Sequence, residues 1–395
     1  MANKPRIRFR GFTEDWEQRK LDDIVKIKTG GGTPKTTNPE YWSGDIPWIQ
    51  SSDLVEGDIV HVNINKYIND RALKNSAAKL ISRDSIALVT RVGVGKVAVI
   101  NQDFTTSQDF LSLSNFDGND IKFFAYQLYR LMQENAKILQ GTSIKGITKT
   151  DLIEQSIVIP SSIQEQNLIA NVLSKIDSII TLHQHKLKKL NLAKKALLQK
   201  LFPRNGSQFP VVRFKGFTDA WEQRKLSDIT EVIMGQSPSS KNYTDNPNDN
   251  ILVQGNADLK DGKVIPRLWT KEITKTIDKD GIILTVRAPV GDVAKTDYKV
   301  VLGRGVAGIK GNDYIYHFLQ KLQNNQYWVS LSSGSTFESI NSNDIKDLII
   351  DIPSIEEQTK ISILLNNVNS IITLHQRKLE KLQEVKKGLL QKMFV

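Results

Sequence analysis

Polar and basic side chains gather in short segments between the apolar runs of this 395-residue chain. Arg and Lys can pair with guanine edges, Gln and Asn with adenine, and Ser and Thr with phosphates or either base type. Ordinary turn-forming roles explain each of these residues equally well when it is taken singly. The candidates for nucleic-acid contact are Lys35, Thr36, Thr37, Gln50, Ser51, Ser52, Arg91, Thr142, Ser143, Lys145, Ser239, Ser240, Lys241, Gln254, Asn256, Arg287, Arg304, Ser335 and Thr336.

The sequence shows no motif of a catalytic site. The chain has no cysteine, which excludes disulfides, thiolate nucleophiles and cysteine-ligated zinc. Residues 92–97 resemble a phosphate-binding loop, but Thr90 replaces its first glycine and no Ser or Thr follows Lys96, so a β-hairpin turn is the better interpretation. Residues 38–41 depart from an amino-methyltransferase signature at the third and fourth positions. We predict no catalytic residue and no methyl-donor or ATP site, and an enzyme with an unrecognised site is the least favoured class.

The five histidines do not predict a metal site. His183 and His185 stand two residues apart in a helical segment, so they point to different faces and cannot chelate together. His183 and His375 occupy equivalent positions in the repeat described below. We predict that they form a polar pair that fixes the register of two helices, in preference to a metal site.

The overall composition is basic and globular. Lys and Arg number 54 against 43 Asp and Glu, a net charge of +11, which is the sign expected for a nucleic-acid partner. No run of eighteen apolar residues is present to span a bilayer, so we expect no membrane association. No apolar segment follows the basic residues 1–10, so we expect no secretory signal and a cytoplasmic location. The length favours two or more domains.

The ends of two halves of the chain repeat one another. Residues 8–24 return as residues 213–229 with 13 of 17 positions identical, and residues 178–202 return as residues 370–394 with 18 of 25 identical. Such self-similarity indicates two tandem copies of one structural plan.

The interiors of the copies, roughly residues 30–150 and 235–340, have diverged. They align only in scattered places, which are residues 90–95 with 286–291 and residues 141–143 with 334–336. The pattern indicates a common fold that carries two different surfaces.

Each copy is predicted to end in a long helix. Ser162 and Ser354 each follow shortly after a proline and precede a glutamate by three positions, a capping-box pattern, so helices should begin near residues 163 and 355. The helices hold 14 basic and 6 acidic residues, which form a solvated face or contact phosphate. In the first helix a coiled-coil seam is predicted at Ile176, Ile180, His183, Leu187, Leu190, Lys194, Leu197 and Leu201.

The connections predict how the two helices pair. Residues 204–352 leave the C-terminal end of the first helix and enter the N-terminal end of the second, and the termini of a domain usually lie close together. The helices should therefore pack antiparallel, with two like domains inverted about a pseudo-two-fold axis. By the same repeat, residues 6–24 should lie against the C-terminal end of the second helix, near Phe394.

The fold class predicted from these patterns is α+β, with two mixed α/β domains joined by two long antiparallel coiled-coil helices. The domains are residues 1–158 and 204–352, and the helical spacers are residues 159–203 and 353–395. Apolar or alternating runs between turn residues predict strands at 45–50, 58–62, 85–90, 96–100, 110–114, 281–286, 300–302 and 348–352, and interior helices at 121–139 and 314–331.

Three motifs together resemble a known family. They are the Gly-Phe-x-x-x-Trp-Glu-x-x-Lys-Leu opening of each copy at residues 11–21 and 216–226, the block from Gly32-Thr33-Pro34 to Asp45-Ile46-Pro47-Trp48-Ile49, and an Ile-Pro pair followed by Glu-Gln at the entry to each long helix. This combination resembles the specificity subunit of type I restriction-modification enzymes over essentially the whole chain. The second copy departs from the block, because residues 235–238 lack the Trp-bearing continuation.

The resemblance implies a DNA-recognition subunit without catalysis of its own. Each domain would be a target-recognition domain that reads one half of a bipartite, asymmetric sequence in double-stranded DNA, and the helices would set the spacing. Separate chains would carry the chemistry: two modification subunits that use S-adenosylmethionine, and restriction subunits that use ATP and Mg. The alternative is a coiled-coil adaptor or scaffold without DNA specificity, which explains the helices but gives no reason for two divergent polar surfaces.

Overall fold

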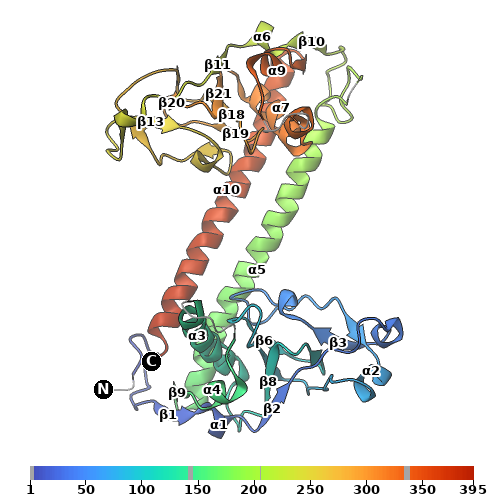
Figure 1. The fold of residues 1–395 in the computed structure, drawn as a ribbon, viewed down its shortest axis with the longest axis vertical. Helices are drawn as coiled ribbons and strands as arrows, with labels where there is room; N and C mark the ends of the chain where they lie inside the picture. The colour runs from blue at the N-terminus through green and yellow to red at the C-terminus, as the bar shows by residue number, and fades with distance from the viewer. Residues whose placement is uncertain (1–3, 141–145, 205, 333–338) are drawn as a thin grey trace. The chain divides into compact units, whose positions relative to one another are not determined.

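The computed structural model describes residues 4–140, 146–204, 206–332 and 339–395. The chain forms two compact units, of which unit 1 comprises Met1–Gln184 and Arg377–Val395 and unit 2 comprises His185–Gln376. Two long helices, α5 (Ile163–Lys200) and α10 (Ile355–Lys392), each contribute to both units, and they begin where the capping patterns predicted (Figure 1). Among the described residues, no helix is both long and apolar enough to cross a bilayer.

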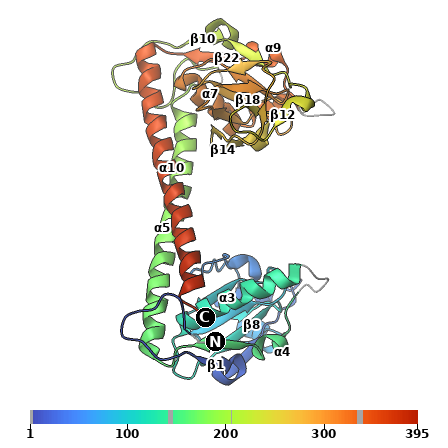
Figure 2. The same cartoon turned by 90° about the vertical axis from the view of Figure 1, so that its left-hand side faces the viewer.

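The centre of unit 1 is an antiparallel sheet in the order β2 (Ile27–Gly30), β8 (Phe110–Ser114), β5 (Ser85–Val89) and β6 (Val97–Ile100). Alternate side chains face opposite sides of a strand. Ile86 and Leu88 therefore enter the core beneath helix α3 (Ile121–Gln140), which lies across this sheet in Figure 2, whereas Ala87 and Val89 enter a second core. Because both faces are covered, β5 and β8 are buried throughout.

A smaller sheet of unit 1 lines the second core. Strand β3 (Ile46–Ile49) pairs antiparallel with β4 (Tyr67–Ile68) and parallel with β7 (Thr105–Thr106). Ile49 and Phe104 pack there against Ala87 and Val89 of the central sheet. The short helices of this region are η1 (Pro39–Trp42), η2 (Ser51–Asp53) and α2 (Asp70–Lys74).

Both ends of the chain complete unit 1. Strand β1 (Glu17–Lys20) pairs with β9 (Ser156–Ile159), flanked by α1 (Leu21–Ile24) and α4 (Lys149–Ile153). The Ile7 N–H donates to the carbonyl oxygen of Lys392 at 2.8 Å. The rings of Trp16 and Phe394 lie 6.4 Å apart between centroids, and both pack on Phe123. The predicted contact of residues 6–24 with the end of α10 is therefore confirmed.

This contact predicts that the chain tolerates circular permutation. We expect that a short linker from Val395 to Met1, with new termini opened between Arg204 and Gly206, preserves folding, and with it the DNA target that the resemblance implies, because Ile7 and Lys392 already meet at 2.8 Å. Unfolding curves of the permuted and wild-type chains would test this. A permuted chain that does not fold, or that folds but selects a different DNA sequence, would contradict it.

Unit 2 repeats this plan. Strand β10 (Glu222–Lys225) pairs with β22 (Ile349–Ile352) in the register that β1 and β9 adopt. The central sheet runs β11 (Val232–Met234), β21 (Val306–Ile309), β18 (Ile282–Thr285), β19 (Val293–Lys295), β15 (Lys263–Val264), β14 (Leu259–Lys260). The second sheet runs β12 (Tyr243–Thr244), β16 (Trp269–Thr270), β13 (Asn250–Val253), β20 (Val300–Leu302), β17 (Thr276–Ile277). The helices are α6 (Leu226–Ile229), η3 (Ser240–Asn242), η4 (Asn256–Asp258), α7 (Asp313–Asn324), α8 (Tyr327–Ser332) and α9 (Ser342–Lys346).

The repeat extends to single hydrogen bonds. The Val212 N–H donates to the Lys200 carbonyl at 2.9 Å, the counterpart of the Ile7–Lys392 bond. Phe202 packs against Trp221 and Tyr314, as Phe394 packs against Trp16 and Phe123 in unit 1. In unit 2 the two contacting segments are consecutive in the chain, because residue 212 comes soon after the end of α5. In unit 1 the corresponding segments are the two opposite ends of the chain.

The predicted capping boxes form only in part. The N–H groups of Glu165 and Glu357 donate to Ser162 and Ser354 at 3.5 and 3.3 Å. Their carboxylates do not return to the cap residues, however, because each forms a buried bidentate pair with an arginine of the repeated opening segment. Arg8 lies 2.6 and 2.8 Å from Glu165, and Arg213 lies 2.8 and 2.9 Å from Glu357. These pairs fasten each opening segment to the start of a long helix.

The long helices run antiparallel within each unit. In unit 1, Leu390 near the end of α10 shares a core with Leu173 near the start of α5. In unit 2, Leu198 near the end of α5 shares a core with Leu365 near the start of α10. Every predicted seam position of α5 is buried or half-buried. The fold class predicted from the sequence, mixed α/β units with antiparallel long helices, is confirmed.

Two of the predicted interior elements are wrong. Residues 58–62 form no strand, because the Asp58 carboxylate accepts from the N–H groups of Val60 and His61 at 2.9 and 3.0 Å and holds a turn. The helix predicted at residues 314–331 is two helices, α7 and α8, because Gln326 between them adopts a φ of 54°. The domain boundaries drawn from the sequence, and the pairing of His183 with His375, stay predictions.

Candidate nucleic-acid interface

Those candidate residues of unit 1 that the structure describes lie in loops that meet at one edge of its two sheets. The Gly32 N–H donates to the Thr106 carbonyl at 2.8 Å, and the Ser107 N–H donates to the Ile49 carbonyl at 2.9 Å. The Thr90 N–H donates to the Asp109 carbonyl at 2.8 Å. The loops that follow β2, β3 and β5 and the loop that precedes β8 are thereby held together, and we call this edge the loop edge of unit 1.

The first candidates on this edge, Lys35, Thr36 and Thr37, are exposed and turn the chain into η1. The Lys35 carbonyl accepts from the Trp42 indole N–H at 3.4 Å, which ties the turn to η1. The Thr33 hydroxyl donates to the Gln108 side chain and ties the start of the same loop to the β7–β8 connection. The backbone of the loop is thus fixed, while the three candidate side chains face solvent.

Gln50, Ser51 and Ser52 form the turn that follows β3. The Gln50 N–H donates to the Asp53 carboxylate at 2.9 Å, and the Ser51 carbonyl accepts from Lys96 Nζ at 2.8 Å. The Gln50 side-chain oxygen accepts from Lys66 Nζ at 3.2 Å. Neither lysine was among the residues predicted from the sequence.

Arg91 is exposed in the turn between β5 and β6. Gly93 and Gly95 adopt φ values of 86° and 111°, and β6 follows directly, so these residues form the predicted hairpin turn and not a phosphate-binding loop. The backbone at Gly146 passes close to Thr90 and Arg91, because a Cβ added to Gly146 would lie only 2.8 Å from the Thr90 carbonyl oxygen. The candidates Thr142, Ser143 and Lys145 lie outside the described residues.

Unit 2 builds its loop edge with the same backbone bonds. The Gly303 N–H donates to the Val253 carbonyl at 2.8 Å, which is the counterpart of the Ser107–Ile49 bond. The Val286 N–H donates to the Gly305 carbonyl at 2.9 Å, which is the counterpart of the Thr90–Asp109 bond. The carbonyls of Thr90 and Val286 in turn accept from Ile147 and Ile340 at 2.9 and 3.0 Å. Gln254 is therefore the structural counterpart of Gln50, and Arg287 that of Arg91.

The side chains on the loop edge of unit 2 have different partners. The Gln254 amide nitrogen lies 2.7 Å from the Tyr243 hydroxyl, and the Asn256 amide donates to Asp292. Lys241, Arg287 and Arg304 are exposed.

The loop that holds Ser239 and Ser240 is anchored by Glu272. Its carboxylate accepts from the Ser239 N–H at 2.8 Å and the Asn242 amide at 2.6 Å, and these bonds lower the pKa of Glu272. The candidates Ser335 and Thr336 lie outside the described residues.

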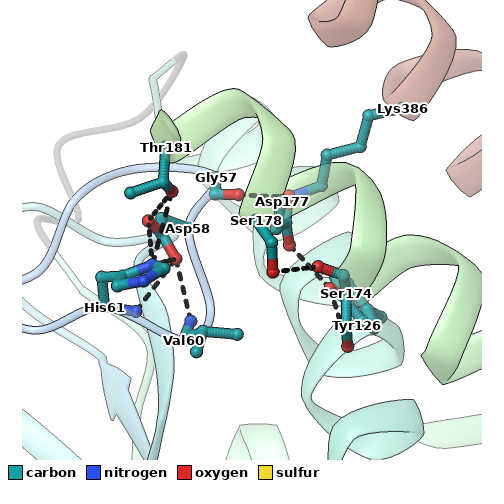
Figure 3. Close-up of polar contacts among 10 residues, drawn as sticks. All are labelled: Gly57, Asp58, Val60, His61, Tyr126, Ser174, Asp177, Ser178, Thr181 and Lys386. Atoms are coloured by element: carbon teal, nitrogen blue, oxygen red, sulfur yellow. Dashed lines mark hydrogen bonds and ion pairs between the residues drawn. The ribbon is translucent and has the colours of Figure 1, made fainter. Parts of the chain in front are cut away.

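A buried polar network joins the two long helices in unit 1 (Figure 3). Lys386 of α10 pairs with Asp177 of α5 and donates to the Gly57 carbonyl, and the Tyr126 hydroxyl donates to Asp177 at 2.6 Å. Burial raises the pKa of Asp177, an effect that the charge of Lys386 opposes. Lys386 is thus neither a solvated lysine nor a phosphate contact, the two roles considered for the helix lysines.

The second cluster in Figure 3 is not a catalytic triad. His61 Nδ1 lies 3.0 Å from Asp58 and 3.4 Å from the Thr181 hydroxyl. Both partners contact the same ring nitrogen, so the imidazole cannot relay a proton from one to the other. No group of three or more potential metal ligands gathers in the part of the chain that the structure describes.

The corresponding site in unit 2 lacks the acidic partner. By the repeat, Lys194 takes the place of Lys386 and Asn369 that of Asp177. Burial lowers the pKa of Lys194 to about 8, and burial also lowers the pKa of the neighbouring His317 to about 4. His317 Nε2 lies 2.9 Å from the Asn366 side-chain oxygen.

Comparisons with known proteins agree on one family. A model of the type I restriction modification DNA specificity domain matches residues 13–192 and again residues 218–384. The chain is similar to the putative type I restriction enzyme MjaX specificity subunit of Methanocaldococcus jannaschii, with 28% identity over 398 residues that cover 95% of this chain and 92% of that protein. It is also similar to the EcoR124I/EcoR124II specificity subunit of Escherichia coli, with 30% identity over 170 residues, 41% of each chain.

Solved structures share the fold. The S subunit of a type I restriction-modification system from M. genitalium matches with a TM-score of 0.68 at 18% identity, over 99% of both chains.

Proposed function

The chain belongs to the family of type I restriction modification DNA specificity proteins, and on this premise we propose that it is the DNA-recognition subunit of a type I restriction-modification enzyme. The observation that carries the proposal is the pair of loop edges. Both edges use the same backbone hydrogen bonds, yet they present different side chains around Gln50 and Gln254. One scaffold with two chemically different edges suits a protein that reads two different half-sites.

Each unit would read one half of a bipartite, asymmetric target in double-stranded DNA. A homologous pair of edges with identical side chains would favour a symmetric target, whereas Lys66 beside Gln50 and Tyr243 beside Gln254 offer different hydrogen-bonding groups. Exposed Arg91 and Arg287 stand at equivalent turns and are suited to guanine edges or phosphates. The net charge of +11 supports the phosphate contacts that such binding requires.

The long helices would set the number of base pairs between the half-sites. Each is a single helix of 38 residues that contributes to both units. At 1.5 Å per residue such a helix is about 57 Å long. We propose that this antiparallel pair acts as the ruler between the two half-sites.

Catalysis would reside in other chains. We propose that two modification subunits supply methylation with S-adenosylmethionine, and that restriction subunits use ATP and Mg for translocation and cleavage. This chain would recognise the target sequence and provide the surface on which those subunits assemble. A coiled-coil adaptor without DNA specificity is the alternative, and salt-dependent, sequence-selective binding to duplex DNA distinguishes the two.

The proposal predicts that the half-sites can be changed separately. In the complex with its partner subunits, Arg91→Ala should relax one position of the half-site read by unit 1, with a loss of discrimination of about 1–3 kcal/mol. Arg287→Ala is the matched variant and should relax only the other half-site. Sequencing of methylated positions in cells that carry each variant measures both. If either variant instead weakens binding to all DNA equally, that arginine contacts phosphate.

A further inference from the structure

We infer that Gln50 and Lys66 act together as a pair of hydrogen-bond donors that selects a guanine in the half-site read by unit 1. The inference rests on the proposed function and deepens it, because it assigns a base preference to one place on one loop edge.

The first step is the orientation of the Gln50 amide. An ammonium group can only donate hydrogen bonds, so the group 3.2 Å from Lys66 Nζ must be the Gln50 oxygen. The amide NH₂ is therefore turned away from Lys66. It makes no hydrogen bond to any other residue that the structure describes, and it stands on the loop edge beside Ser51. Gln50 thus presents donors to a ligand.

The second step is the placement of Lys66. The Trp48 N–H donates to the Lys66 carbonyl at 2.9 Å, which fixes its backbone beside β3. Its ammonium lies 5.4 Å from the ring centre of Trp48 and 6.0 Å from that of Trp42, an arrangement that restrains a cation. Lys66 forms no ion pair within the described part of the chain, and its side chain is exposed, so its remaining protons are available to a ligand.

The third step is the match to a base. The ammonium and the amide NH₂ form two adjacent donor groups. In the major groove, guanine presents two adjacent acceptors, N7 and O6. Adenine places a donor beside its acceptor, cytosine presents a donor, and thymine presents one acceptor beside a methyl group. Guanine is the base that satisfies both donor groups at once.

Unit 2 lacks this pair at the equivalent place. The Leu252 N–H donates to the Leu268 carbonyl at 2.9 Å, the counterpart of the Trp48–Lys66 bond, so Leu268 replaces Lys66. Gln254 meets the Tyr243 hydroxyl at 2.7 Å, and a hydroxyl can both donate and accept. Among the residues that the structure describes, no cation contacts the side-chain oxygen of Gln254. Unit 2 therefore has no donor pair at this place, and we expect no preference for guanine there.

The test exchanges the two residues in the full complex with its partner subunits. For Lys66→Leu, one guanine position in the half-site of unit 1 should accept adenine as well, because the freed Gln50 oxygen can accept from the adenine amino group. Discrimination between the two bases at that position should fall about ten-fold or more. Leu268→Lys should make the corresponding position of the other half-site favour guanine. Methylated-base sequencing and competition binding with duplexes substituted at single positions measure both.

Each variant carries an internal control, because the half-site of the unaltered unit should remain unchanged. Lys26→Leu is the external control, since Lys26 precedes β2 at the end remote from the loop edge and pairs with Asp117 at 3.4 Å. An unchanged motif for Lys66→Leu overturns the inference. So does a half-site without guanine, or an equal weakening on all DNA, which would make Lys66 a phosphate contact. A wild-type complex that methylates no defined sequence would instead overturn the proposed function.

Discussion

Replacing Lys386 with methionine is expected to lower the free energy of unfolding by about 3–5 kcal/mol. The substitution leaves the carboxylate of Asp177 buried with only the Tyr126 hydroxyl at 2.6 Å as partner, and an unpaired buried charge is costly. Chemical denaturation of the variant and of the wild-type protein gives the difference. The loss should be smaller at pH 5 than at pH 8, because burial raises the pKa of Asp177 and its protonation in acid removes the uncompensated charge.

Lys194→Met is the matched control, because Lys194 holds the same position in unit 2 opposite Asn369 instead of an aspartate. It should cost little or stabilise the protein at pH 7. Burial lowers the pKa of Lys194 from 10.5 to about 8, so the unfolded chain binds more protons between these values and the stability of the wild-type protein rises with pH across that window. The variant should lose this rise. If both lysine variants lost equal free energy of unfolding, the packing of the lysine methylene groups, and not the charge, would account for the loss.

Lengthening both long helices by four residues, after Leu190 in α5 and after Leu382 in α10, is expected to move the protein to a new DNA target. Four residues add about 6 Å of helix, which spans at most about two base pairs of 3.4 Å. The gap between the half-sites should therefore grow by one or two base pairs while both half-sites stay the same. A site with the old gap should bind about 10³-fold more weakly, as non-specific DNA does.

Methylated-base sequencing measures the gap directly. The same four residues inserted in the exposed turn at residues 245–248 of unit 2 should leave the gap as it was. A changed half-site with an unchanged gap would refute the role of the helices as a ruler.

The elements that the sequence predicted are those with a strong apolar pattern. Strand β8 and helix α3 were placed almost to the residue because their side chains enter buried cores. Strands β1 and β10 were missed because Glu-Gln-Arg-Lys has no apolar face, and these strands form through pairing with β9 and β22. Tertiary pairing of this kind leaves no periodic signal in the strand itself.

Some residues of the candidate interface were predicted from the sequence, and others were missed. Gln50 and Arg91 were found because they follow apolar runs that end in turns, and the structure brings both to the loop edge. Lys66 was missed because its contact with Gln50 depends on the pairing of β3 with β4, a strand of two residues that the sequence pattern did not predict. Lys96 was considered only as part of a phosphate-binding loop, and its bond to the Ser51 carbonyl depends on the close approach of two loops.

Unit 1 is built from both ends of the chain, and this determines the order in which the two units can fold during synthesis. Unit 2 is one continuous stretch, His185–Gln376, and can close as soon as it leaves the ribosome, whereas unit 1 needs Arg377–Val395. At about 5–20 residues per second, Phe394 is made about 15–55 s after Phe123 and about 20–75 s after Trp16, and these two side chains stay uncovered until then. The half of the protein that is made first is therefore finished last, and a nascent chain cut short before Phe394 exposes the aromatic core of unit 1 beside a completed unit 2.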